Sequence, residues 1–162
     1  MTPGIEAVKR AGIAYQVHQY AHDPAADSYG LEAAEKLSVA PEQVFKTLVA
    51  KLDGSTLVVA IIPVSARLNL KQLARALGGK KAVMAEPGDV ERSTGYVLGG
   101  VSPLGQKKAL LTVLDAPAQA WETILVSAGR RGLEIELSPQ DLLTLTRGSW
   151  GSISQSGSAE KP

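Results

Sequence analysis

Cysteine is absent from the 162-residue sequence, and aromatic side chains are few: one Phe, four Tyr and two Trp. Without cysteine the chain has no disulfide, no cysteine zinc site and no cysteine nucleophile, so its chemistry does not use a protein thiol. Because aromatic residues are scarce, aliphatic residues must supply most of the apolar area, whose burial stabilises a fold by roughly 25 cal/mol per Å². Hydrophobic residues make up 44% of the chain, and the length suits one domain with an aliphatic core.

The net charge is also close to zero, because the sequence contains 17 basic and 16 acidic residues. A protein that binds a long duplex through bulk charge must neutralise many phosphates, so this balance argues against DNA binding and leaves room for a small phosphate site. The longest apolar run, residues 57–64, is far shorter than the roughly 18 to 20 residues that span a bilayer, and residues 1–12 lack a signal-peptide pattern. We therefore expect a cytoplasmic protein without a membrane partner.

No internal repeat is visible, and the periodicity predicts helices and strands in irregular order. Helices are expected over residues 4–11, 28–37 and 70–77, with a further capped helix start at 138–141. Strands are expected over residues 13–17, 44–52, 57–64, 82–85, 96–99, 110–114, 123–127 and 133–137. This mixture favours an α+β fold: a curved, mostly antiparallel sheet or partial barrel with helices packed outside.

Two further signals concern a turn and the end of the chain. Asp53-Gly54 lies between two apolar runs and predicts a tight hairpin, because both central positions of such a turn need positive φ. After Gly148 the composition turns to Gly, Ser, Gln, Glu and Lys, which bury too little apolar surface to offset the entropy of ordering. We therefore expect one domain over residues 1–153 and a mobile tail over 154–162.

Lys46 is the most unusual side chain in the predicted strands, because its neighbours two, four and six residues on are Leu48, Ala50 and Leu52. Lysine is rarely placed on an apolar face. If it is partly buried, its ammonium is available to hold a phosphate or carbonyl oxygen, or its pKa falls enough for base chemistry. In the alternative, its stem covers apolar surface while its head reaches water. The pattern alone leaves both interpretations open.

Two glycine-containing loops carry candidate binding groups. Residues 99–105 contain three glycines and a proline, and the backbone N–H groups of such a bend can bind an oxyanion, although most Gly-Pro loops are only turns. Residues 127–132 contain Arg130 and Arg131. Together with Lys80-Lys81 and Lys107-Lys108, these arginines form a phosphate-binding edge if the three doublets meet at one rim, and ordinary solubilising charge if they are scattered.

Metal and nucleophile motifs are not evident. His18 and His22 have no third ligand at metal spacing, so we expect no metal and no cofactor. Ser93, Ser102 and Ser127 have no evident histidine partner, and neither a G-x-S-x-G elbow nor a phosphate-binding loop is present. Glu134 and Glu136 share one face of a predicted strand, where solvated carboxylates are the commoner outcome. A solvated carboxylate is the better interpretation for Glu136 than for Glu134, because Glu134 lies closer to the arginine loop.

Six segments taken in order are together similar to one known family. They are residues 20–24, 44–48, 92–96, 99–108, 115–117 and 127–133. In these segments the chain resembles the YbaK (EbsC) type of Cys-tRNA(Pro) deacylase, a free-standing relative of the editing domain of bacterial prolyl-tRNA synthetases. The resemblance runs from about residue 1 to about residue 153. It implies the fold of that editing domain, an aminoacyl-tRNA deacylase activity acting in trans, and two partners: the aminoacyl-tRNA acceptor end and prolyl-tRNA synthetase.

The resemblance also implies site residues. Lys46 is expected to be the residue most needed for activity, near the terminal nucleotide or the ester. The family's G-x-x-x-P loop is expected to orient and stabilise the ester through Gly99, Gly100, Val101, Ser102 and Pro103. Substrate-binding roles are implied for Tyr20, His22, Thr47, Arg92, Ser127, Gly129 and Glu134. This chain departs from the family at Glu134, where aspartate is usual, and at Ala128, where glycine is usual and would tolerate a positive φ.

The mechanism expected from the family needs no protein nucleophile, because the thiolate of the misattached cysteine attacks its own ester carbonyl and the ribose hydroxyl leaves. The enzyme then binds, orients and stabilises charge. Three alternatives stay open at this stage. The chain could remove alanine from the same tRNA by attack of water, bind aminoacyl-tRNA or the synthetase without catalysis, or bind oligonucleotides in general, which the charge balance makes the weakest of the three.

Overall fold

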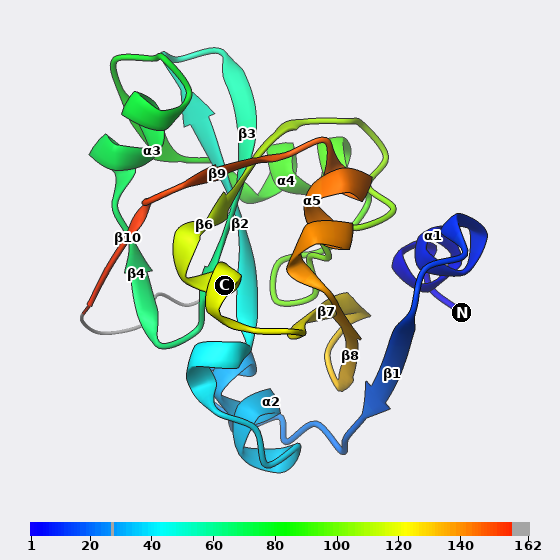
Figure 1. The fold of residues 1–162 in the computed structure, drawn as a ribbon. Helices are drawn as coiled ribbons and strands as arrows, with labels where there is room; N and C mark the ends of the chain where they lie inside the picture. Colours follow the sequence, from blue (N-terminus) through cyan, green and yellow to red (C-terminus); the bar gives the residue numbers. More distant parts are fainter. Residues whose placement is uncertain (27, 157–162) are drawn as a thin grey trace.

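The computed structural model describes residues 1–26 and 28–156 (Figure 1). Over these residues the helices are α1 (Pro3–Ala11), α2 (Tyr29–Lys36), α3 (Leu70–Ala76), α4 (Pro87–Thr94) and α5 (Pro139–Thr146), with short 3-10 helices at Pro41–Gln43 and Ala116–Ala120. The strands are β1 (Tyr15–Gln19), β2 (Phe45–Leu52), β3 (Thr56–Pro63), β4 (Ala66–Leu68), β5 (Ala82–Met84), β6 (Leu111–Asp115), β7 (Ile124–Arg130), β8 (Leu133–Leu137), β9 (Ser149–Gly151) and β10 (Ser154–Ser156). None of the helices in these two ranges is both long and apolar enough to cross a membrane.

The predicted α+β class is confirmed, and the sheets are partly parallel. Within the described ranges, one sheet has the order β5-β2-β3-β6-β9, a second has the order β1-β8-β7, and β10 pairs with β4. The pairs β3–β6 and β6–β9 are parallel, and the other pairs of strands are antiparallel. The chain between β3 and β6 holds α3, β5 and α4, which gives the long connection that a parallel pair requires.

The hairpin predicted at Asp53-Gly54 is present, but its loop contains three residues, Asp53, Gly54 and Ser55, and not the two that the Asp-Gly signal predicts. Asp53 has a φ of 50° and Gly54 a φ of 76°, and Leu52 faces Thr56 across the turn. The strands on either side pair along their whole length, from Phe45 with Pro63 to Leu52 with Thr56. This turn fixes the register of β2 and therefore the side of the sheet on which Lys46 lies.

Side-chain caps explain where most of the predicted helices begin. The hydroxyls of Thr2, Ser28 and Ser138 and the amide oxygen of Asn69 each accept a hydrogen bond from a backbone N–H in the first turn of the helix that follows. These bonds satisfy donors that a helix start otherwise leaves unpaired. The helices predicted over 4–11, 28–37 and 70–77, and the helix start at 138–141, are confirmed within one or two residues at each boundary.

The segment after β5 differs from the prediction. Pro87 begins α4, which has no side-chain cap and so gives a weak signal in the sequence. The strand predicted over residues 96–99 is wrong, because this segment is a turn leading into the glycine loop. Tyr96 is buried and its hydroxyl donates to the carbonyl of Leu104, while Val97 is 59% exposed. No neighbouring strand pairs with this short apolar run in the described part of the chain.

The core has two main layers on either side of the five-stranded sheet. One face of the sheet packs against β7, β8, α1, α4 and α5 through residues such as Phe45, Val126 and Leu142. The other face packs against α3 through Leu48 and Leu73. A third, smaller cluster joins the two larger sheets where Val44 bridges Leu125 in parallel and α2 covers them with Ala33 and Ala34. We call this contact between the sheets the Val44–Leu125 seam.

The C-terminal end of the domain lies further along the chain than predicted. The tail was expected from residue 154, yet Ser154–Ser156 form β10, which pairs with β4. The buried carboxylate of Asp115 accepts hydrogen bonds from the backbone N–H of Ile153, at 3.0 Å, and from the hydroxyl of Ser154. These contacts order a segment whose composition alone predicts mobility. The remainder of the predicted tail, residues 157–162, lies outside the described residues.

Replacing Asp115 with Ala is expected to lower the free energy of unfolding by about 1–3 kcal/mol, because buried donors lose their acceptor. Urea denaturation followed by circular dichroism measures this change. In the control Ser154→Ala, which removes one hydroxyl and keeps the carboxylate, a smaller loss is expected. A loss for Asp115→Ala no larger than that of the control would show that the carboxylate does not hold the C-terminal strands.

Candidate active site

One cavity of about 230 Å³ lies where β2, α2, the loop after α4 and the β7–β8 hairpin meet. Its lining includes seven of the thirteen site residues that the family resemblance implies: Tyr20, Lys46, Thr47, Gly99, Val101, Ser127 and Glu134. The other six lie outside the lining: His22, Arg92, Gly100, Ser102, Pro103 and Gly129. The cavity therefore brings the predicted lysine and the predicted loop together.

Lys46 and Thr47 are neighbours on β2, and both are 6% exposed. The register pairs Lys46 with Ile62, which places it on the same side of the sheet as Leu48. The interpretation in which the lysine head reaches bulk water is therefore wrong. Thr47 contributes a buried hydroxyl oxygen for which the described residues provide no hydrogen-bond partner. An unpaired buried hydroxyl is unfavourable, so the Thr47 hydroxyl is a polar group that these residues leave unsatisfied next to Lys46.

The glycine-proline loop contributes fewer groups to the cavity than predicted. The N–H of Gly100 donates to the carbonyl of Val97, at 3.0 Å, so it is occupied within the turn. Ser102 is fully buried, and its hydroxyl accepts from the N–H of Leu104. Among the described residues, no acceptor is bonded to the N–H groups of Gly99 and Val101. Gly99 and Val101 are also the residues of this loop that line the cavity, so their amides are the candidates for binding a developing oxyanion.

Two further groups of the cavity lining, Glu134 and Tyr20, have strongly shifted acidity. Burial raises the pKa of Glu134 to about 8, and the residue is 6% exposed. Burial, and then the negative charge of Glu134, raises the pKa of Tyr20 to about 12. Near neutral pH both side chains are therefore mainly protonated and can donate hydrogen bonds. The solvated carboxylate that the strand pattern favours is thus not found at Glu134.

Gly129 lies within a β-bulge whose two ends, Ser127 and Arg130, line the cavity. The register shifts between Ser127 and Arg130, and the N–H of Gly129 donates to the hydroxyl of Ser127 at 3.1 Å. Gly129 has a φ of 119°, and a Cβ atom there would lie 2.6 Å from the ring of Tyr96. Ala128, where the resembled family usually has glycine, is not among the residues with positive φ. The alanine is therefore accommodated without backbone strain.

His22 and Arg92 lie outside the cavity and have other partners. His22 Nδ1 lies 2.7 Å from Glu32 Oε1, and the His22 ring contacts the edge of Tyr29. Burial raises the pKa of Glu32, but bonds from the Asp23 N–H and from His22 outweigh it, so the net shift is downward. Arg92 is exposed on α4 and pairs with Asp89 at 2.5 Å. The geometry gives neither residue a direct position on a ligand in the cavity.

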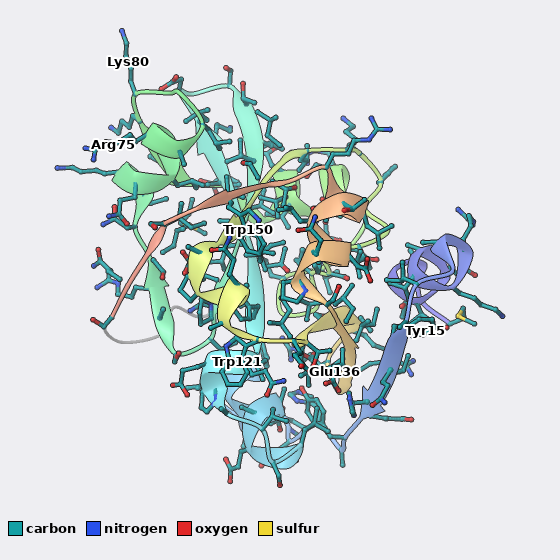
Figure 2. All side chains as sticks on the ribbon, in the orientation of Figure 1. Tyr15, Arg75, Lys80, Trp121, Glu136 and Trp150 are labelled. Atoms are coloured by element: carbon teal, nitrogen blue, oxygen red, sulfur yellow. The ribbon has the colours of Figure 1, made fainter. Side chains whose placement is uncertain are left out.

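The three basic doublets do not all meet at one rim. Arg130 and Arg131 line the cavity. Lys80 lies at the far tip of the molecule beyond α3, well away from the β7–β8 hairpin (Figure 2). The phosphate-binding edge made of all three doublets is therefore not formed, and the arginine doublet is the one at the cavity. In the described ranges, no group of three or more His, Cys, Asp or Glu residues could hold a metal ion.

Sequence patterns missed Tyr29 as a lining residue. Its ring lies under the guanidinium of Arg131, with the Arg131 Cζ atom 3.6 Å from the ring centroid. Tyr29 is the first residue of α2, so helix periodicity gives no hint that it faces a cavity. Met84 and Leu98 also line the cavity and are 45% and 42% exposed. Exposure of large apolar side chains at a cavity mouth is a signal that only the structure provides.

The fold is that of a class of proteins that edit aminoacyl-tRNA. Residues 22–145 match the family model of the aminoacyl-tRNA editing domain, and the chain belongs to this family. It is 40% identical over 153 residues to EbsC of Enterococcus faecalis, which is named as a candidate Cys-tRNA(Pro)/Cys-tRNA(Cys) deacylase; the match covers 94% of this chain and 92% of that protein.

A more distant relative and a solved structure are also similar to this chain. The multifunctional Ser/Thr-tRNA deacylase ProXp-y of Escherichia coli is 30% identical over 106 residues, which cover 63% of this chain and 64% of that protein. The crystal structure described as that of a candidate trans-editing enzyme for prolyl tRNA synthetase superposes with a TM-score of 0.82. That comparison covers 94% of this chain and 95% of the other at 24% identity, so it supports the fold.

The raised pKa of Glu134 predicts that stability falls as pH rises. The folded state keeps this carboxyl protonated up to about pH 8, whereas the unfolded chain releases the proton near pH 4.5. Its contribution is therefore complete below about pH 4.5 and is lost as pH rises towards 8, with a slope of up to about 1.4 kcal/mol per pH unit. Glu134→Gln is expected to flatten this dependence in urea denaturation at pH 5, 6, 7 and 8.

Glu136 on the same strand provides the control. A bond from the hydroxyl of Thr123 lowers the pKa of Glu136, and His18 lowers it further. Its contribution is present above about pH 4.5 and is lost as pH falls, so Glu136→Gln is expected to change the profile on the acid side only. An unchanged slope between pH 5 and 8 in Glu134→Gln would show that Glu134 ionises normally.

Proposed function

We propose that this chain hydrolyses Cys-tRNA(Pro) in trans, using the thiolate of the misattached cysteine as the nucleophile. The observation that carries the proposal is one cavity lined by the buried Lys46, by Gly99 and Val101, whose N–H groups have no bonded acceptor among the described residues, and by the protonatable Glu134. Such a set can bind an ester and stabilise the charge that develops on its carbonyl oxygen. The activity in the name of the Enterococcus faecalis relative agrees with the proposal.

The proposed reaction begins with attack of the cysteine thiolate on its own ester carbonyl carbon. A C–S bond forms, the C–O bond to the terminal ribose breaks, and the ribose oxygen takes up the proton that the thiol released. The products are a free tRNA 3′ end and a cysteine thiolactone, which water then opens to cysteine. The enzyme's part is to hold the side chain and the carbonyl in reactive geometry, which is the largest advantage available to an intramolecular reaction.

Each lining group has a role in this proposal. The Lys46 ammonium attracts the ester region or the terminal phosphate, and the amides of Gly99 and Val101 point to the carbonyl oxygen as it becomes negative. Glu134 and Tyr20 would donate hydrogen bonds from the cavity lining. Serine and alanine esters lack a comparable nucleophile, so the chemistry itself would select cysteine.

The proposal includes prolyl-tRNA synthetase as a partner and the cytoplasm as the location. With a formal charge of +1, the chain offers little bulk attraction for a whole tRNA. A synthetase that already holds the tRNA would supply that affinity and release the misacylated acceptor end to this cavity. The aminoacyl-tRNA is thus recognised here mainly by its terminal part.

The test is a deacylation assay of the purified chain with tRNA(Pro) charged with cysteine, alanine, serine, threonine or proline. Release of cysteine is expected to be the fastest by about 100-fold or more, because only cysteine carries the attacking group. Equal or faster release of alanine would favour attack by water. Faster release of serine or threonine would instead match the activity in the name of the Escherichia coli relative. No release of any amino acid would favour a binding module.

A further inference from the structure

The cavity mouth contains a stack of two planar groups that the proposed chemistry does not use. The guanidinium of Arg131 lies over the ring of Tyr29, 3.6 Å from its centroid. Both residues line the cavity. Tyr29 is half-buried, and Arg131 is exposed in the turn between β7 and β8. The stack therefore stands at the boundary between the cavity and solvent.

The surroundings hold this stack in place from several sides. Gly99 has a φ of 91°, and a Cβ atom at this position would lie 2.7 Å from the Tyr29 ring and 2.8 Å from an Arg131 guanidinium nitrogen. The loop backbone thus packs directly against both groups. On another side, the ring of His22 meets the edge of Tyr29 with centroids 5.7 Å apart, and Glu32 fixes His22 at 2.7 Å. His22 is therefore a positioning residue for Tyr29.

The lining residues also differ in depth in a way that matches an aminoacyl ester of a nucleoside. Lys46, Thr47 and Glu134 are each 6% exposed and form the deep part of the cavity. The Tyr29–Arg131 stack and the apolar side chains of Met84 and Leu98 form the outer part. An amino acid bound at the deep groups would leave the attached nucleoside beside the outer ones.

We infer that the Tyr29–Arg131 stack is the platform for the terminal adenine base of the aminoacyl-tRNA, an inference that rests on the proposed function. Bases stack on aromatic rings and on arginine planes, and such contacts contribute about 1–3 kcal/mol per base whatever the base is. The ring of Tyr29 below and the backbone of Gly99 beside it keep the guanidinium flat at the mouth. Arg131 and Tyr29 thereby supply affinity for the nucleoside, while the deep groups act on the ester.

The experiment compares two stable analogues in which an amide replaces the ester. One is the cysteinyl amide of 3′-amino-3′-deoxyadenosine, and the other is the same amide on a methyl riboside that has no base. NMR titration measures the Kd of each. The full chain is expected to bind the adenosine analogue at least about 10-fold more tightly, which corresponds to about 1.4 kcal/mol. In Arg131→Ala this advantage is expected to fall to within about 2-fold.

Further variants distinguish a Tyr29–Arg131 stack that binds the base from one that only stabilises the fold. Tyr29→Phe keeps the ring and should keep the advantage, whereas Tyr29→Leu should lose it. Arg75→Ala changes an exposed arginine of α3 that is outside the cavity, and it should bind both analogues as the parent chain does. Equal binding of the two analogues by the parent chain, or an advantage that persists in Arg131→Ala, would overturn the platform.

The proposed function is tested separately with the cysteinyl ester of the methyl riboside. The parent chain and Arg75→Ala should hydrolyse this ester at equal rates, because Arg75 lies outside the cavity lining. Failure of both to hydrolyse it would count against the proposed function, while the binding comparison would still decide whether the stack holds a base.

Discussion

Replacing Lys46 with Met is expected to lower kcat for Cys-tRNA(Pro) deacylation by about 10²–10³-fold, which is the effect of removing one group that stabilises developing charge. Lys46 is 6% exposed and lines the cavity together with Gly99 and Val101. A charge in so enclosed a position is screened little by water, so its loss should appear mainly in the chemical step. Single-turnover measurements at saturating enzyme separate this step from binding.

The control for Lys46→Met is Lys51→Met on the same strand. Lys51 lies outside the cavity lining and pairs with Asp89 at 3.4 Å, so its replacement should leave the rate unchanged. Met fills nearly the same space as the lysine stem, and circular dichroism with urea denaturation establishes that both variants are folded. Activity of folded Lys46→Met within about 3-fold of the parent chain would remove the lysine from the mechanism.

The second large effect is expected from the substrate. S-methylcysteinyl-tRNA(Pro) should be deacylated at least about 100-fold more slowly than the cysteinyl form, because a thioether cannot supply the thiolate whose intramolecular position gives the rate advantage. The measurement is release of labelled amino acid under single-turnover conditions. The same comparison with Glu134→Gln shows whether the buried carboxyl contributes to selection of the thiol.

Binding of the methylated substrate needs its own control, since exclusion from the cavity would also abolish hydrolysis. One added methyl group is small against a cavity of about 230 Å³, so S-methylcysteinyl-tRNA should compete with the cysteinyl form. Hydrolysis of both at similar rates would mean that an activated water attacks. Slow hydrolysis without competition would mean that the cavity rejects the methyl group by size.

Signals within a few residues of sequence predicted much of the fold, but they could not predict which distant strands pair. Caps at Asn69 and Ser138 and the Asp53-Gly54 turn act within a few residues, so the helices and the β2–β3 hairpin follow from the sequence. The parallel pairing of β3 with β6 depends on a crossover that composition does not encode. The strand β10 was missed because its order comes from Asp115, a residue far away in the sequence.

The site was predicted in its chemistry and less well in its geometry. Lys46 stood out because a lysine on an apolar strand face needs an explanation, and the structure buries it at the cavity. The glycine loop was predicted, but the sequence does not tell which of its N–H groups are already bonded within the turn. The N–H of Gly100, for example, donates to the carbonyl of Val97. The contact of Arg131 with Tyr29 joins the β7–β8 turn to the first residue of α2, and only folding brings these two segments together.

The Val44–Leu125 seam has a consequence for how such enzymes diversify. It joins the sheet that carries Lys46 to the sheet that carries Glu134, so the angle between the two sheets sets the width of the space between these side chains. Packed interiors respond to a change of one methylene. Ala33, Ala34 and Val64 pack at this junction. Replacing one of them with a larger or smaller side chain would therefore change the size of the amino acid that the cavity accepts, while every reacting group stays the same. Evolution of new selectivity in this scaffold can begin at a hinge of small aliphatic residues.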